Sequence, residues 1–60
     1  MKRIDELCGC AWNVAIVKVA TVVERRLGVK YTLREDWDAL EHLAMDLDIR
    51  FDENGEIVNK

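Results

Sequence analysis

The sequence predicts a mainly α-helical fold, in which an antiparallel two-helix hairpin is followed by a short C-terminal β-hairpin or a folded-back tail. Three observations support this prediction. Apolar residues recur at helical spacing over residues 4–27 and again over residues 33–48, Gly28 separates the two stretches, and proline is absent. We expect the 60 residues to form a single domain, 1–60.

The first predicted helix spans residues 4–27. Its apolar side chains share one broad face of a 100° helical wheel: Ile4, Cys8, Ala11, Trp12, Ala15, Ile16, Val19, Val22 and Val23. Gly28 is typical of a helix C-terminus, where glycine adopts the left-handed conformation. The many β-branched residues would also suit a strand, but the length of the segment favours a helix. Gly9 leaves open a start at Cys10.

The second predicted helix spans residues 33–48. Thr32 and Glu35 have the spacing of a capping box at its N-terminus. The apolar stripe that follows is expected to face the core: Leu33, Trp37, Leu40, Leu43, Ala44 and Leu47. Because only residues 28–32 connect the helices, we expect an antiparallel pair. Arg26 and Asp36 lie beside this connection, and we predict that they form an ion pair.

Residues 49–60 form the predicted hairpin or tail. The dipeptide Asn54-Gly55 is a strong turn signal between two short apolar runs. An isolated two-stranded hairpin is marginally stable in water. We therefore expect Phe51 and Ile57 to pack against the helices.

The first helix is apolar over more of its circumference than one partner helix can cover, because Cys10, Val14 and Val17 fall on its otherwise polar side. We expect a homodimer that forms a four-helix bundle. The predicted self-association residues are Trp12, Ile16, Val19 and Val23. Two alternatives are that the tail covers this surface within the monomer, and that a foreign protein does so.

The net charge of −3 is unevenly distributed, because residues 35–56 are strongly acidic and contain one basic residue, Arg50. We predict a small regulatory or inhibitory protein-binding module that acts through an acidic helix surface. We expect this module to bind a basic or nucleic-acid-binding protein. In a narrower form of the hypothesis, its acidic surface imitates the charge of a nucleic acid. The predicted partner-binding residues are Asp38, Glu41, Asp46, Asp48, Asp52 and Glu53. The alternative for this surface is an ordinary solvated helix face.

Two other functions fit the same sequence. A helical-hairpin dimer could bind RNA or DNA through a basic patch near the inter-helix connection, made of Lys18, Arg25, Arg26 and Lys30. Both tryptophans fall in the predicted core, however, so aromatic platforms for base stacking are missing. The chain could also be a structural subunit of a larger assembly.

The sequence does not suggest an enzyme, a metal site or a cofactor. Cys8 and Cys10 would point about 200° apart on a helix, so we interpret them as small buried apolar residues rather than metal ligands. His42 has acidic neighbours but no pocket that would orient a substrate. The apolar run from Cys10 to Val23 is too short for a membrane span of about 20 residues. A soluble, cytoplasmic protein is the expectation.

Overall fold

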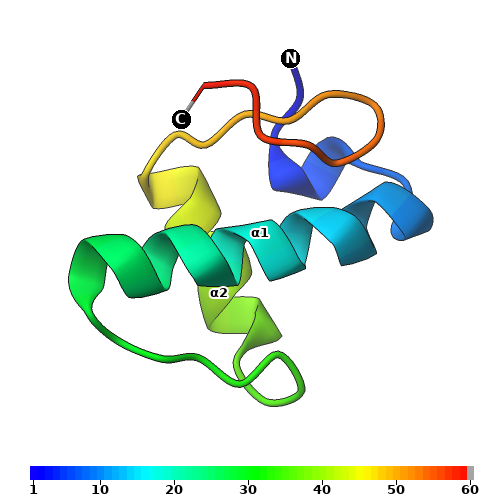
Figure 1. The fold of residues 1–60 in the computed structure, drawn as a ribbon. Helices are drawn as coiled ribbons and strands as arrows, with labels where there is room; N and C mark the ends of the chain where they lie inside the picture. The colour runs from blue at the N-terminus through cyan, green and yellow to red at the C-terminus, as the bar shows by residue number, and fades with distance from the viewer. Residues whose placement is uncertain (60) are drawn as a thin grey trace.

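The computed structural model describes residues 1–59 and is mainly helical, as predicted. A short 3₁₀ turn, η1 (Ile4–Glu6), precedes the long helix α1 (Gly9–Leu27) and the shorter helix α2 (Trp37–Asp46). α2 lies behind α1 and crosses it steeply, and the C-terminal tail lies over both beside the N-terminal segment (Figure 1). The prediction of an antiparallel hairpin is therefore wrong, and residues 28–36 form a longer connection than expected.

The predicted first helix is divided into two parts. η1 ends at Glu6, and Leu7 and Cys8 adopt extended backbone conformations before α1 begins at Gly9. The other end of this helix is as predicted. Gly28 is left-handed, with φ 69°, and its N–H donates to the carbonyl of Glu24. This end is encoded locally, because glycine adopts positive φ without the steric cost of a Cβ.

The second helix begins four residues later than predicted, at Trp37. The amides of Glu35 and Asp36 donate to the carbonyl of Thr32, which closes a turn before the helix. The carboxylate of Asp36, rather than that of Glu35, accepts the N–H of Thr32 at 2.8 Å. The predicted capping box is therefore replaced by a Thr32–Asp36 interaction that ends the connection instead of extending the helix.

α2 ends in a Schellman-type arrangement. Asp48 takes the left-handed position, with φ 55°, while its N–H donates to Met45 and the N–H of Ile49 donates to Ala44. This turn redirects the chain away from the helix axis. The tail that follows is thereby led back over α1.

The tail folds back through two isolated antiparallel bridges, one from Phe51 to Lys2 of the N-terminal segment and one within the tail, from Phe51 to Ile57. Asp52 closes the turn, because its Oδ1 accepts the amides of Asn54 and Glu56 at 2.9 and 3.0 Å. Gly55, with φ 84°, lies so close to α1 that a Cβ there would overlap the carbonyl of Ala11. The described part of the chain, residues 1–59, thus has a folded-back tail without a regular strand.

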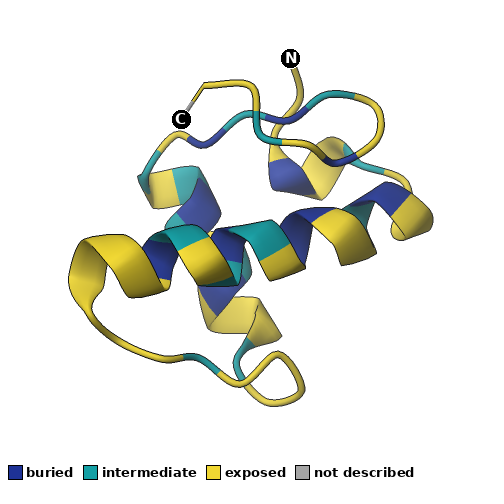
Figure 2. Cartoon of the chain, in the orientation of Figure 1, coloured by how far each residue is buried: buried dark blue, intermediate teal, exposed yellow. Residues whose placement is uncertain are grey.

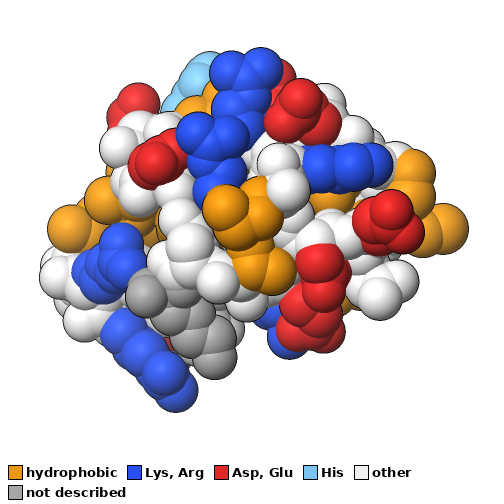
Figure 3. Space-filling view, turned by 90° about the horizontal axis from the view of Figure 1, so that it is seen from above, with side chains coloured by type: hydrophobic (Ala, Val, Ile, Leu, Met, Phe, Trp, Pro, Cys, Tyr) orange, Lys and Arg blue, Asp and Glu red, His pale blue; other side chains and the backbone are white. Residues whose placement is uncertain are grey.

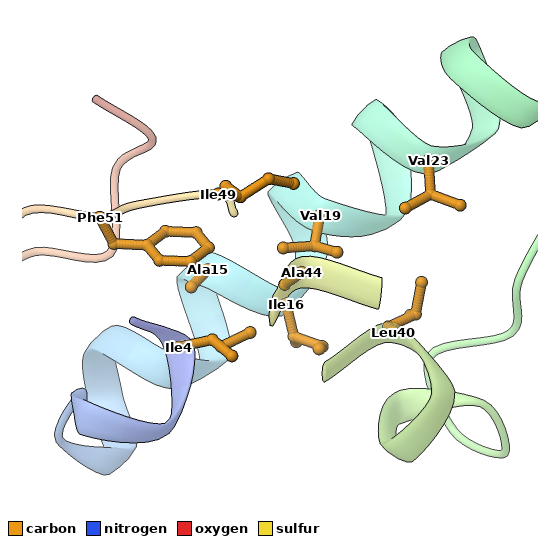
Figure 4. Close-up of a cluster of buried hydrophobic side chains, with 9 residues drawn as sticks. All are labelled: Ile4, Ala15, Ile16, Val19, Val23, Leu40, Ala44, Ile49 and Phe51. Carbon is orange, nitrogen blue, oxygen red and sulfur yellow. The ribbon is translucent and has the colours of Figure 1, made fainter. Parts of the chain in front are cut away.

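The core is built from η1, both helices and the tail (Figure 4). Its buried side chains are Ile4, Ala15, Ile16, Val19, Val23, Leu40, Ala44, Ile49 and Phe51. Phe51 is fully buried, so the tail supplies one of the largest core side chains. Ile16, Val19 and Val23, which we predicted at a self-association surface, are instead buried within the single chain. A dimer of this fold would have to use other side chains.

Candidate protein-binding surface

The exposed side of α2 carries a row of polar side chains at intervals of one helical turn. Asp38, His42 and Asp46 are all exposed and four residues apart, so they lie above one another on the helix. Leu40 and Ala44 on the opposite side anchor the helix in the core. The packing of α2 therefore fixes which way its acidic row faces.

An aromatic pair lies at the N-terminal end of this row. The ring centroids of Trp12 and Trp37 are 5.8 Å apart, and the rings meet edge to face at 76°. Trp37 is 45% exposed, although the sequence pattern placed it in the core. The Nε1–H of Trp12 donates to Glu41 Oε2 at 2.7 Å, which joins α1 to α2 beside the pair. We call Trp37, Asp38, Glu41, His42 and Asp46 the acidic face of α2.

The six predicted partner-binding residues have different surroundings. Glu41 accepts the indole hydrogen bond, and Asp52 closes the tail turn. Asp48 Oδ1 accepts two hydrogen bonds from Arg50, at 2.9 Å from Nε and 2.6 Å from Nη2. The other three are exposed, and none is in an ion pair within residues 1–59: Asp38, Asp46 and Glu53. The structure thus brings together part of the predicted acidic surface and uses the rest to stabilise turns and contacts.

The basic patch lies on a different side of the molecule, between α1 and the tail. A hollow of about 180 Å³ is lined by Val22, Arg25, Arg26, Ile49 and Ile57. Next to it, Lys18 forms an ion pair of 3.0 Å with Glu56 of the tail. Lys30 lies apart in the connection after α1. Arg25 and Arg26 therefore border an apolar floor, and Lys18 is already paired.

The face formed by the N-terminal segment and the tail carries charges of both signs. Acidic and basic side chains alternate there around a small apolar patch (Figure 3). On the same side, the Arg3 N–H donates to Glu6 Oε1 at 2.8 Å. This hydrogen bond, helped by the charge of Arg3, lowers the pKa of the exposed Glu6 carboxyl. The hydrogen bond from the Arg3 N–H to Glu6 therefore stabilises η1.

The described residues do not gather into a metal-binding cluster. Among residues 1–59, no three His, Cys, Asp or Glu side chains are placed to hold one metal ion. Cys8 and Cys10 are free and exposed, so our interpretation of them as buried apolar residues is wrong. The predicted Arg26–Asp36 ion pair is also absent from this part of the chain. Instead, the Asp36 carboxylate binds the Thr32 amide.

No helix of the described chain is both long enough and apolar enough to cross a bilayer. In the comparisons with known proteins, no family model, no curated protein and no solved structure matches this chain.

Proposed function

We propose that this chain is a small regulatory or inhibitory protein-binding module, and that the acidic face of α2 binds a basic surface on another protein. The observation that carries the proposal is the half-exposed Trp37 beside Asp38, whose carboxylate forms no ion pair within residues 1–59. Tryptophan residues of this kind contribute a large share of the binding energy at protein interfaces. Nearby charges increase the association rate and select the partner.

The arrangement of the aromatic pair supports this use. The rings of Trp37 and Trp12 pack edge to face, and Trp12 is held by its hydrogen bond to Glu41. An exposed ring held in place loses little conformational freedom when it is buried by a partner, which lowers the entropic cost of binding. Asp38 and Asp46 flank the same helix face and would attract a cationic partner.

Imitation of nucleic acid is a narrower version of the same proposal. A phosphate array is a regular series of exposed anions. Of the six predicted acidic residues, three are engaged within the chain: Glu41, Asp48 and Asp52. A partner that combines an apolar pocket for Trp37 with basic side chains therefore fits this face better than one that recognises charge alone.

The test compares the wild-type chain with two charge-reversed variants as immobilised baits. Asp38→Lys with Asp46→Lys changes the acidic face, while Glu24→Lys with Glu35→Lys makes the same charge change elsewhere on the exposed surface. We expect a partner that binds the wild type and the control, and that is lost with the double Asp variant, with Trp37→Ala and at high salt. Far-UV circular dichroism checks that each variant folds. Equal binding by both charge-reversed baits would refute the proposal.

Binding of RNA or DNA through Lys18, Arg25, Arg26 and Lys30 is the second candidate. The apolar floor beside Arg25 and Arg26 makes this candidate weaker, because phosphates do not favour apolar contact. Arg25→Glu with Arg26→Glu would abolish nucleic-acid binding and leave binding through the acidic face intact. A role as a structural subunit predicts binding that is insensitive to both charge reversals.

We also propose a cytoplasmic location for this protein-binding module, since exposed free thiols suit a reducing compartment.

A further inference from the structure

The side of α1 that points away from the core carries no charge over three turns. Its exposed residues are Cys10, Val14, Val17 and Thr21, which we call the outward row of α1. Val14 and Val17 are 41% and 49% exposed. In Figure 2, α2 and the tail leave the near side of α1 exposed. Solvent-facing sides of helices are normally polar, so this row is an unpartnered apolar surface.

The spacing of the row is that of a helix–helix contact. Its members are separated by four, three and four residues, which is the a/d pattern of a coiled coil. The hydroxyl of Thr21 donates to the carbonyl of Val17 at 3.3 Å, so it needs no partner in a contact. The neighbouring cation of Lys18 is held by Glu56 of the tail. A second helix could therefore pack on the row without leaving the Thr21 hydroxyl or the Lys18 cation unpaired.

We propose that a second copy of this chain covers the outward row, with the two α1 helices antiparallel. In this register Cys10 lies opposite Thr21 of the partner subunit, and Val14 lies opposite Val17 of the partner subunit. The two contacts repeat through a twofold axis, so the same surface serves both protomers, as in other isologous dimers. The spacing of the row, four, three and four residues, is the same in either direction, so the row is complementary to itself when two copies lie antiparallel.

The charge that ends the row decides the orientation. Glu24 continues the spacing three residues beyond Thr21 and is exposed. A parallel pair would place Glu24 directly against its own copy. The antiparallel pair places it near the start of the partner's α1, at Gly9, where the helix dipole favours an anion. The antiparallel order also brings the two helix dipoles head to tail.

This dimer is independent of the acidic face of α2, because α2 packs against the core side of α1 (Figure 1). It would present two acidic faces, one from each protomer. The contact uses few side chains, so we expect a weak, concentration-dependent association. It also replaces the predicted bundle interface with residues that the fold leaves exposed.

The first experiment measures mass by sedimentation equilibrium from micromolar to millimolar concentration. We expect the wild type to dimerise, and Val14→Glu with Val17→Glu to stay monomeric over the same range. The control is Val29→Glu with Val58→Glu, two similarly exposed valines outside the row, which should dimerise like the wild type. Circular dichroism confirms folding of each variant. A wild type that is monomeric at every concentration would overturn the proposal and leave the row to a foreign helix.

The second experiment tests orientation by disulfide trapping with copper phenanthroline as the oxidant. Cys8→Ser leaves one thiol, Cys10, and preserves a good helix-capping residue. In the antiparallel register the two copies of Cys10 are 11 positions apart along the axis, about 16 Å at 1.5 Å per residue, so this variant should stay uncrosslinked.

Adding Thr21→Cys to this background should give a rapid covalent dimer in which peptide mapping finds Cys10 joined to position 21. Adding Asn13→Cys instead places the second thiol beside the row and should give little crosslinking. Efficient crosslinking of Cys10 to itself in the Cys8→Ser variant would show a parallel pair. That result, or no crosslink with Thr21→Cys, contradicts the proposal.

Discussion

Trp12 and Glu41 join the two helices through a 2.7 Å hydrogen bond from the indole Nε1–H to the carboxylate Oε2. The two residues are 29 positions apart, so this contact exists only in the folded chain. It also fixes the ring on which Trp37 packs. The contact therefore connects the stability of the fold to the shape of the proposed binding surface.

Replacement of Glu41 tests this connection. Glu41→Ala should lower the free energy of unfolding by about 1 kcal/mol, because the half-buried indole N–H loses its acceptor. Glu41→Gln retains an acceptor oxygen and should lose less. Urea titration followed by tryptophan fluorescence measures both, with His42→Ala as an exposed control on the same helix. A Glu41→Ala variant as stable as the control would show that the hydrogen bond contributes nothing.

The glycine residues provide a matched series for the docking of the tail on α1. Gly55→Ala should lower the free energy of unfolding by at least about 2 kcal/mol, because the new Cβ would meet both a positive φ and the Ala11 carbonyl. Gly28→Ala has a positive φ but open space around it, and should cost about 1 kcal/mol. Gly9→Ala, with neither constraint, should be neutral or slightly stabilising.

Thermal melts of the three variants rank these costs. If Gly55→Ala proves no worse than Gly28→Ala, the close approach of the tail turn to α1 is not maintained in solution.

Replacing Asp36 with alanine should lower the stability of the fold more than replacing Arg26 with alanine. Asp36→Ala removes the acceptor for the Thr32 amide just before α2, at a cost of about 1 kcal/mol. Arg26→Ala removes an exposed side chain without an ion pair in the described chain and should change stability by less than about 0.5 kcal/mol. Denaturant titration distinguishes the two. Equal losses of stability in the two variants would support the Arg26–Asp36 ion pair that the sequence predicted.

Glu6 should make a small contribution to stability that depends on pH. Its folded-state pKa is lowered by the Arg3 amide, so ionised Glu6 stabilises the folded state. The contribution is fully present above the unfolded-state pKa and is lost as the pH falls through the lower folded-state pKa. The melting midpoints of the wild type and Glu6→Gln should therefore differ at neutral pH and converge in acid. A difference that persists in acid would assign the effect to something other than the charge.

Part of this fold could be predicted from short-range patterns. The two helical segments, the left-handed Gly28 and the turn at Asn54-Gly55 depend on nearest neighbours and on local hydrogen bonds. The apolar face of the first helix also contained the correct core side chains, since periodicity shows which side of a helix is buried. It did not show what would cover that side. We assigned Ile16, Val19 and Val23 to a second copy, whereas Phe51 and Ile49 of the same chain join them in the core.

The candidate binding surface was predicted less completely. Sequence placed the acidic residues on α2 and in the turn, but it could not separate the exposed Asp38 and Asp46 from Asp48 and Asp52, which bind within the chain. The exposure of Trp37 was missed because its helical spacing with Leu40 and Ala44 placed it in the core stripe, whereas it is the first residue of α2 and stays exposed. The spacing of Thr32 and Asp36 was the available signal, since an Asp side chain that binds an earlier amide competes with the helix.

The sequence by itself determined that this chain is helical, where its first helix ends, and which residues are apolar enough to form a core. Tertiary structure decided that α2 crosses α1, that Ile49 and Phe51 of the tail rather than a second copy complete the core beside α1, and that the outward row of α1 stays uncovered. The reason is physical. Local patterns determine backbone conformation and the polarity of each helix side, whereas the segment that covers an apolar side is selected by packing among the whole chain.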